Sequence, residues 1–150
     1  MSLCSIVSIV TEMYIRGMGE VVTTDEFADW FATLDDDQRK AVVHIVALLE
    51  LKGLTLAYPH SSALKGTHYP FRELRSQRYS TALRIVYAHD PHRDAVLVIG
   101  GDKTGNTRFY EEIIPRAESI WKEYLKERAQ EEARKPASAA QPKGRKPRGR

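Results

Sequence analysis

Three strand-like runs follow one another in the second half of the chain, and they constrain the fold more than any other feature. They span Phe71–Arg75, Ala82–Ala88 and Ala95–Ile99. The third run is continuously apolar and rich in β-branched residues, which is typical of a central strand. The polar turn at Asp90–Asp94 separates the second run from the third. Because strands joined by such short connections pair antiparallel, the sequence predicts an antiparallel meander.

Two amphipathic helices precede these runs. The first shows apolar residues at i, i+3, i+4 and i+7, namely Phe27, Trp30, Phe31 and Leu34. Thr23 and Glu26 fit a capping box at its start. The acidic run Asp35–Asp37 predicts the start of a second helix, and Gly53 predicts its end. A short strand at 20–23 and a helical hairpin are therefore expected.

The rest of the chain completes an α+β pattern. Residues 54–70 read as a loop, and Pro115 suits the first turn of a last helix that frays near Arg134. The order strand, helix, helix, three strands, helix predicts an N-terminal strand and a helical hairpin packed on an antiparallel sheet, followed by a C-terminal helix. The hairpin should cover one face of the sheet and leave the other face to carry function.

Length and cysteine content favour one intracellular domain. The 150 residues suit a single core, and the lone Cys4 permits neither an internal disulfide nor a cysteine-based zinc site. No apolar run is long enough for a membrane span, and no basic segment precedes the mildly apolar Leu3–Val10, so a cytoplasmic protein without a signal peptide is expected. We expect a poorly ordered extension at 1–17, a folded domain at 18–134 and a disordered basic tail at 135–150.

The positive charge is unevenly distributed. The tail from Lys135 holds six of the 23 basic residues and no acid, so 17 bases and 20 acids remain in the rest of the chain. Within that rest, residues 12–50 carry nine acids and three bases, whereas residues 65–108 carry eight bases and four acids. The second half therefore favours a polyanionic partner, most simply RNA.

Basic and aromatic side chains accompany the predicted meander. Alternation along the strands places Arg72 and Arg75 on opposite faces, and likewise Arg84 and Tyr87. The other members of this set are Lys65, Lys103, Arg108, Phe109 and Tyr110. Cations neutralise phosphate and rings stack on bases, so the mixture suits a nucleic acid. Solvated strand faces with core tyrosines are the alternative explanation.

The spacing of five short motifs resembles the HigB-like branch of the RelE/ParE toxin superfamily. The resemblance covers about residues 20–128, and the motifs are Leu64–Gly66, Phe71–Arg75, Leu83–Tyr87, Val98–Gly105 and Arg108–Glu111. It implies a RelE-like fold and a toxin of a type II toxin–antitoxin system, a microbial RNase that cuts mRNA on the ribosome. It also implies an antitoxin partner, which we expect to carry a helix-turn-helix DNA-binding domain.

The resemblance also implies roles for individual residues. Arg84, Lys103 and Tyr110 match catalytic positions, and Lys65 and Arg75 match positions that contact phosphate. With Arg72 and Arg108 added from the basic cluster, the predicted RNA contacts are Lys65, Arg72, Arg75 and Arg108. Cleavage would use the 2′-OH of the RNA itself, so no metal and no cofactor are expected.

Other functions stay open at this point. Many RNA-cutting members carry arginine or histidine where this chain has Lys103 and Tyr110, and a related branch poisons DNA gyrase without cutting RNA. A non-catalytic binding inhibitor, acting on gyrase or blocking the ribosome, is therefore the main alternative. A plain RNA-binding module is another. His89 and His92 flank a turn with Asp90 and Asp94, a weak metal-site pattern that exposed turn residues explain better.

Overall fold

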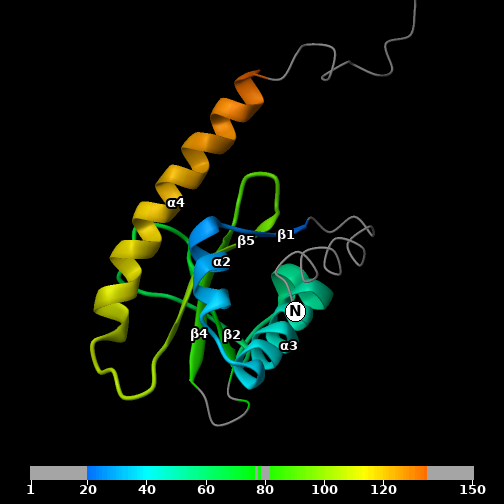
Figure 1. Ribbon diagram of the computed structural model, residues 1–150. Helices are drawn as coiled ribbons and strands as arrows, with labels where there is room; N and C mark the ends of the chain where they lie inside the picture. The colour runs from blue at the N-terminus through cyan, green and yellow to red at the C-terminus, as the bar shows by residue number, and fades with distance from the viewer. Residues whose placement is uncertain (1–19, 77, 79–81, 135–150) are drawn as a thin grey trace, which may run out of the picture.

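The described part of the chain forms one five-stranded sheet with helices on both faces (Figure 1). The computed structural model describes residues 20–76, 78 and 82–134, so the extension predicted at 1–17 and the tail predicted at 135–150 lie outside the described residues. The elements are β1 (Val21–Thr23), α2 (Asp25–Ala32), α3 (Asp36–Lys52), the 3-10 helix η1 (Gly53–Thr55), β2 (Ser61–Ala63), β3 (Arg72–Ser76), β4 (Leu83–His89), β5 (Ala95–Asp102) and α4 (Phe109–Arg134).

The predicted antiparallel meander of β3, β4 and β5 is confirmed. The sheet as a whole is mixed, however, because its order is β1-β5-β4-β3-β2 and β1 pairs parallel with β5. The intervening helices and strands supply the long crossover that a parallel pair requires. At the opposite edge, β2 lies within the predicted loop 54–70 and pairs antiparallel with β3. So short a strand carries little pattern of its own and depends on its partner.

The helical hairpin covers one face of the sheet, as predicted. Phe27 and Phe31 of α2 and Ile45 and Leu49 of α3 are buried in the core on this side. The predicted cap of α2 is wrong by one residue, since the Thr24 hydroxyl accepts the hydrogen bond from the Phe27 N–H. The capping box at the start of α3 joins Asp35 to Gln38, and α3 ends at Gly53 as predicted.

The other face is not open, because α4 packs across it. Phe109, Ile113, Ala117 and Trp121 recur every four residues and bury the inner side of this helix. Pro115 is exposed on the outer side, so α4 starts six residues earlier than the proline suggested. Figure 1 shows the C-terminal turns of α4 extending past the sheet. Any functional surface on this face must therefore lie at an end of α4 rather than across the sheet.

β5 extends beyond its predicted end at Ile99 and includes Gly100 and Gly101. A Cβ at Gly100 would overlap the Trp30 ring on the hairpin side. A Cβ at Gly101 would lie 2.8 Å from the Phe109 ring on the α4 side. The strand continues to Asp102 because these residues still pair with β4, and glycine is required at both positions because Trp30 and Phe109 pack directly against the backbone.

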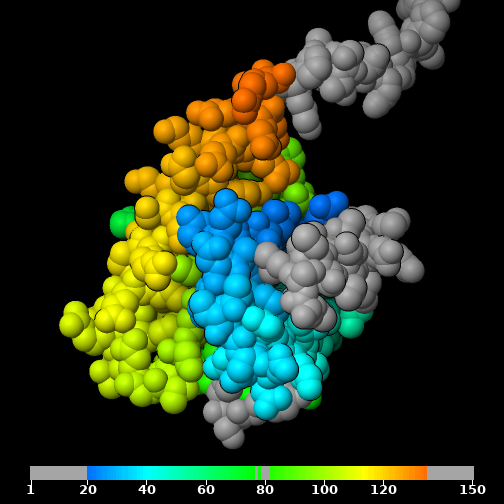
Figure 2. All heavy atoms as spheres, viewed as in Figure 1, coloured from blue at the N-terminus to red at the C-terminus, as the bar shows by residue number. Residues whose placement is uncertain are grey.

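α2 and α4 lie side by side on one side of the molecule (Figure 2), and their residues line a shallow hollow there. Four of its lining residues are acidic: Asp25, Glu26, Glu123 and Glu127. This acidic side would repel phosphate, so a polyanion would bind elsewhere on the protein, where the basic residues lie. None of the helices in the described ranges combines the length and hydropathy that crossing a membrane needs.

Candidate functional site

A cluster of charged side chains lies where β3, β4 and the first turn of α4 meet. Arg75 and Arg84 are direct partners in the register between β3 and β4. Glu73 lies two residues before Arg75, so alternation places it on the same face of β3. Tyr110, the second residue of α4, reaches this face from above the sheet. The cluster thus combines residues that are far apart in the sequence.

Glu73 is the centre of the cluster. Its Oε2 accepts hydrogen bonds from Arg75 Nη1 at 2.9 Å and from Ser62 Oγ at 3.2 Å. Its Oε1 accepts a hydrogen bond from the Tyr110 hydroxyl at 2.8 Å and lies 3.7 Å from Arg84 Nε. The residue is only 3% exposed. A buried carboxylate is tolerated here because two arginines and two hydroxyls compensate for its lost hydration.

Arg84 is also buried, yet its donors are not all used. Arg84 Nη1 donates to the Leu83 carbonyl oxygen at 3.0 Å, while the buried Nε has no hydrogen-bond partner. The Nε of Arg75 is buried and unpartnered in the same way. A guanidinium carries five N–H donors in a planar fork that matches the oxygens of a phosphate. Both Nε atoms are buried, so an anion reaches them only after a local side-chain movement, and the Arg75 side chain, 23% exposed, is the more accessible of the two.

Tyr110 is held in its protonated form. Burial raises the pKa of its hydroxyl first, and the hydrogen bond to Glu73 and the charge of Glu73 raise it further, against the opposing effect of Arg84. The Lys103 Nζ lies 5.4 Å from the centroid of the Tyr110 ring, within cation–π range. The Lys103 N–H donates to the Ala82 carbonyl oxygen at 3.0 Å, which fixes the lysine beside the start of β4.

The structure brings Arg84, Lys103 and Tyr110, the three predicted catalytic residues, into one cluster. Glu73 was quoted only as part of a motif and given no role. The signal was nevertheless present, since an acid two residues from Arg75 must share its face of β3. The catalytic roles of Arg84, Lys103 and Tyr110 stay predictions.

The four residues predicted to contact RNA do not lie together in one place. Arg75 belongs to the cluster, but Arg72 lies on the hairpin face, where its Nε donates to Ser61 Oγ at 2.9 Å. Arg108 is exposed and pairs with Glu111 at 2.8 Å. Lys65 is exposed in the loop between β2 and β3. The basic surface is therefore divided between the two faces of the sheet.

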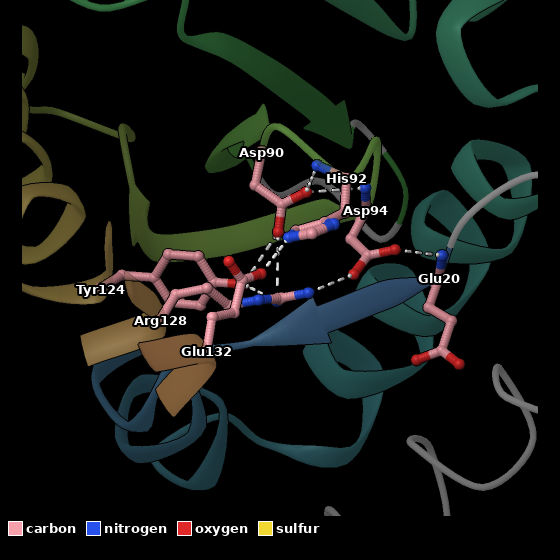
Figure 3. A network of polar contacts seen from close by, with 7 residues as sticks. All are labelled: Glu20, Asp90, His92, Asp94, Tyr124, Arg128 and Glu132. Atoms are coloured by element: carbon pink, nitrogen blue, oxygen red, sulfur yellow. Dashed lines mark hydrogen bonds and ion pairs between the residues drawn. The ribbon is translucent and has the colours of Figure 1, made fainter. Parts of the chain in front are cut away.

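A second polar network fastens the turn between β4 and β5 to α4 (Figure 3). Arg128 Nη1 lies 3.2 Å from Asp90 Oδ2, and Arg128 Nη2 lies 3.3 Å from Asp94 Oδ2. Tyr124 donates to Asp90 Oδ2 at 3.1 Å and accepts from Arg128. Burial and the Asp90 charge raise the pKa of Tyr124 to about 12, against the opposing charge of Arg128. This network is structural.

The outer part of the same network extends to the ends of the described domain. His92 pairs with Glu132 near the end of α4, and the Glu20 N–H donates to Asp94 Oδ1 at 2.9 Å (Figure 3). The turn residues thus serve to hold α4 and β1 in place. Within the described ranges, no group of three or more His, Cys, Asp and Glu side chains lies where it could hold a metal ion.

Glu118 fastens the middle of α4. Its Oε2 accepts hydrogen bonds from Thr67 Oγ1 at 2.7 Å and from the His68 N–H at 2.9 Å. The Thr67 bond and then the His68 backbone bond hold the pKa of Glu118 below its usual value. Together with Arg128, this contact fixes the helix that presents Tyr110.

The α+β sheet, the helical hairpin and a basic cluster under the first turn of a C-terminal helix define a RelE-like fold. Residues 29–122 match the family described as phage-derived protein Gp49-like (DUF891). The chain belongs to this family of toxin–antitoxin toxins, which confirms its resemblance to the HigB-like branch of the RelE/ParE superfamily.

Two proteins of Mycobacterium tuberculosis H37Rv are similar to this chain. The one named "Putative toxin HigB3" is 36% identical over 107 residues, which are 70% of this chain and 92% of that protein. The one named "Putative toxin HigB2" is 30% identical over 130 residues, which are 85% of this chain but 63% of that protein. No solved structure shows a significant match.

Proposed function

We propose that this toxin is a ribosome-dependent mRNA endoribonuclease that needs no metal and inhibits translation by cutting message. The observation that carries the proposal is Arg84, a buried arginine with an unused Nε donor beside Tyr110 and Lys103. Burying a cation is costly unless it is paired, and the Glu73 contact at 3.7 Å compensates for only part of that cost. A phosphate on Arg84 would supply the missing hydrogen bonds.

Tyr110 and Glu73 form a pair that can take the proton of the attacking 2′-OH. As the 2′-oxygen bonds to phosphorus, its proton passes to the Tyr110 oxygen, while the Tyr110 proton passes to Glu73 Oε1 along the 2.8 Å hydrogen bond. This route avoids a free phenolate, which the raised pKa of Tyr110 disfavours. Positioned acid–base groups of this kind typically contribute ~10²–10⁴ in rate.

Arg84 and Lys103 deal with charge and with the leaving group. Arg84 stabilises the negative charge that grows on the phosphoryl oxygens during attack. Lys103 is the proton donor for the 5′-oxygen as its bond to phosphorus breaks. The products are a 2′,3′-cyclic phosphate and a free 5′-hydroxyl. DNA has no 2′-OH, so it would not be cut.

The partners follow from the family. Two relatives bear the names of HigB toxins, so we propose that a cognate antitoxin holds this protein inactive, and that this antitoxin carries a helix-turn-helix DNA-binding domain. The mRNA target on ribosomes implies action in the cytoplasm. The six basic residues of 135–150 would add nonspecific affinity for RNA or the ribosome.

Inducible expression with growth curves and RNA-end mapping tests the proposal. Arg84→Ala should abolish growth arrest and the new RNA ends, since phosphate positioning and charge stabilisation are lost together. Lys122→Ala removes a positive charge on an exposed part of α4 and should behave as wild type. Circular dichroism checks that each variant is folded.

The competing function is a binding inhibitor, either a gyrase poison or a ribosome blocker. It predicts growth arrest without new RNA ends. Cleavage by this cluster is wrong if the folded Arg84→Ala and Lys103→Ala variants still arrest growth and produce the same RNA ends as wild type. It is also wrong if growth arrest occurs without new RNA ends in any of the proteins.

A further inference from the structure

We propose that Tyr58 and a hollow at the end of β3 form a binding site for one unpaired nucleobase, next to the phosphate that Arg84 would hold. The proposal rests on the proposed function, because it names a further part of the RNA-binding site. Neither the family match nor the cluster around Glu73 assigns a role to this region. It lies where the end of β3, the middle of α3 and residues 57–60 meet.

Tyr58 is an aromatic side chain in an unusual setting. It is 75% exposed, more than any other large apolar side chain among the described residues. The Arg75 guanidinium lies over its ring, 5.7 Å from the centroid. Since Arg75 covers one face only, the other face is accessible to solvent. An exposed ring backed by an arginine is the arrangement on which single-stranded bases stack.

The hollow beside Tyr58 has polar groups to recognise the edge of a base. Its volume is about 220 Å³, and its lining consists of His44, Ile45, Pro59, His60, Arg75, Ser76 and Arg78. Ser76 is 4% exposed, yet its Oγ is buried without a hydrogen-bond partner. The buried Nε of Arg75 is also unpartnered. Such groups cost free energy when nothing binds them. Both atoms are buried in the free protein, so a base gains hydrogen bonds to them only when the lining side chains move.

Arg75 connects this hollow to the proposed cleavage cluster. It lines the hollow and stacks on Tyr58, while its Nη1 donates to Glu73 Oε2 at 2.9 Å. The Arg75 N–H donates to the His60 carbonyl oxygen at 2.9 Å, which ties the segment after Tyr58 to β3. A base in the hollow would therefore belong to a nucleotide neighbouring the scissile phosphate.

The chemistry favours RNA over a protein partner at this place. The lining is dominated by histidine, arginine and serine, which suits the polar edge of a nucleobase with a phosphate next to it. Stacking on Tyr58 also requires a base that is not already stacked in a duplex. The site would thus select single-stranded RNA and influence which nucleotide stands beside the cut.

Two readouts test the site. The first is fluorescence anisotropy with short single-stranded RNA probes whose 2′-O-methyl sugars prevent cleavage, one probe intact and others with a single abasic nucleotide at successive positions. Tyr58→Ala should weaken binding of the intact probe about 5- to 100-fold, the range expected for losing one base stack. Tyr58→Phe keeps the ring and should bind like wild type, and Ser76→Ala should weaken binding less.

The abasic probes identify the base. With wild type, one abasic probe should lose as much affinity as the Tyr58→Ala variant loses for the intact probe. The Tyr58→Ala variant should bind that abasic probe and the intact probe equally well. Leu51→Ala is the matched control, since Leu51 is an apolar side chain 65% exposed that does not line the hollow. The second readout is RNA-end mapping in cells, where Tyr58→Ala should change the preferred nucleotide beside the cuts.

The outcomes separate this inference from the proposed function. If wild type produces no new RNA ends but Tyr58→Ala and one abasic position still weaken binding, the nuclease proposal fails and the base site stands. If wild type cuts RNA and Tyr58→Ala keeps both its affinity and its cut sites, the base site is wrong. It is also wrong if Tyr58→Ala weakens binding only of the antitoxin, or if neither readout responds.

Discussion

The Tyr110 hydroxyl donates a hydrogen bond of 2.8 Å to Glu73 Oε1, joining the first turn of α4 to the middle of β3. The two residues are 37 positions apart in the chain. Because α4 is fastened at Glu118 and again at Arg128, the position of Tyr110 over the sheet is determined by contacts along the whole helix.

Tyr110→Phe should separate chemistry from folding. The variant keeps the ring beside Lys103 and loses only the hydroxyl, so RNA cleavage should fall by ~10²–10⁴. Stability should fall by about 1 kcal/mol, the usual net contribution of one hydrogen bond. RNA-end mapping and urea unfolding measure the two effects. Wild-type cleavage by the folded variant would exclude Tyr110 from proton transfer.

Glu73→Gln should destabilise the fold markedly. The amide keeps the shape but removes the charge that separates Arg75 from Arg84, leaving the buried Arg84 and the half-buried Arg75 as unneutralised cross-strand neighbours. Breaking a buried ion pair typically costs about 3–5 kcal/mol. The measurement is the free energy of unfolding in urea. Glu111→Gln is the control, because its carboxylate is 69% exposed and should contribute under ~1 kcal/mol.

Tyr124 should make the stability of the protein sensitive to alkaline pH. Its folded pKa of about 12 lies above the ordinary 10.0, so its contribution is fully present below pH 10 and is lost as the pH rises from 10 toward 12. The loss is on the order of 1 kcal/mol, because partial exposure reduces the effect.

The comparison with Tyr124→Phe isolates this titration from that of other groups. Urea unfolding of both proteins between pH 9 and about 12 should show wild type losing more stability than the variant. A constant difference between the two across that interval would show that Tyr124 does not titrate as its surroundings imply.

Gly100→Ala should destabilise the core by about 1–3 kcal/mol, the usual cost of overpacking. The added Cβ would overlap the Trp30 ring on the hairpin face. Trp30→Leu in the same chain makes room and should restore part of the loss, which thermal unfolding can follow. If the double variant is no more stable than expected from adding the two single effects, the contact is not the cause.

Removal of residues 135–150 should leave the fold intact and weaken RNA or ribosome binding. The segment contains six basic residues and no acid, so its loss should make the salt dependence of binding shallower. Affinity measured at several salt concentrations gives this slope. An unchanged slope would show that the tail takes no part in binding.

The sequence by itself determined the elements whose signals are local. The apolar spacing of Phe27 and Phe31, the Asp35 cap and the stop at Gly53 were together sufficient to predict the hairpin. The β-branched run from Ala95 correctly predicted a strand in the interior of the sheet, β5, although β4 is the middle strand. These features depend on residues within a few positions of one another, and so they can be read along the chain. The family resemblance named Arg84, Lys103 and Tyr110 as catalytic residues, and those roles stay predictions.

Only the tertiary structure decided where α4 begins, where β2 lies and what surrounds the cluster. The first turns of α4 form because Phe109 and Ile113 bury themselves against β5, and β2 forms because β3 offers a free edge. Glu73 became the centre of the cluster only when α4 brought Tyr110 above it. Contacts between distant segments gain their free energy from burial and pairing, and no local pattern in the sequence records which distant segment will supply the partner.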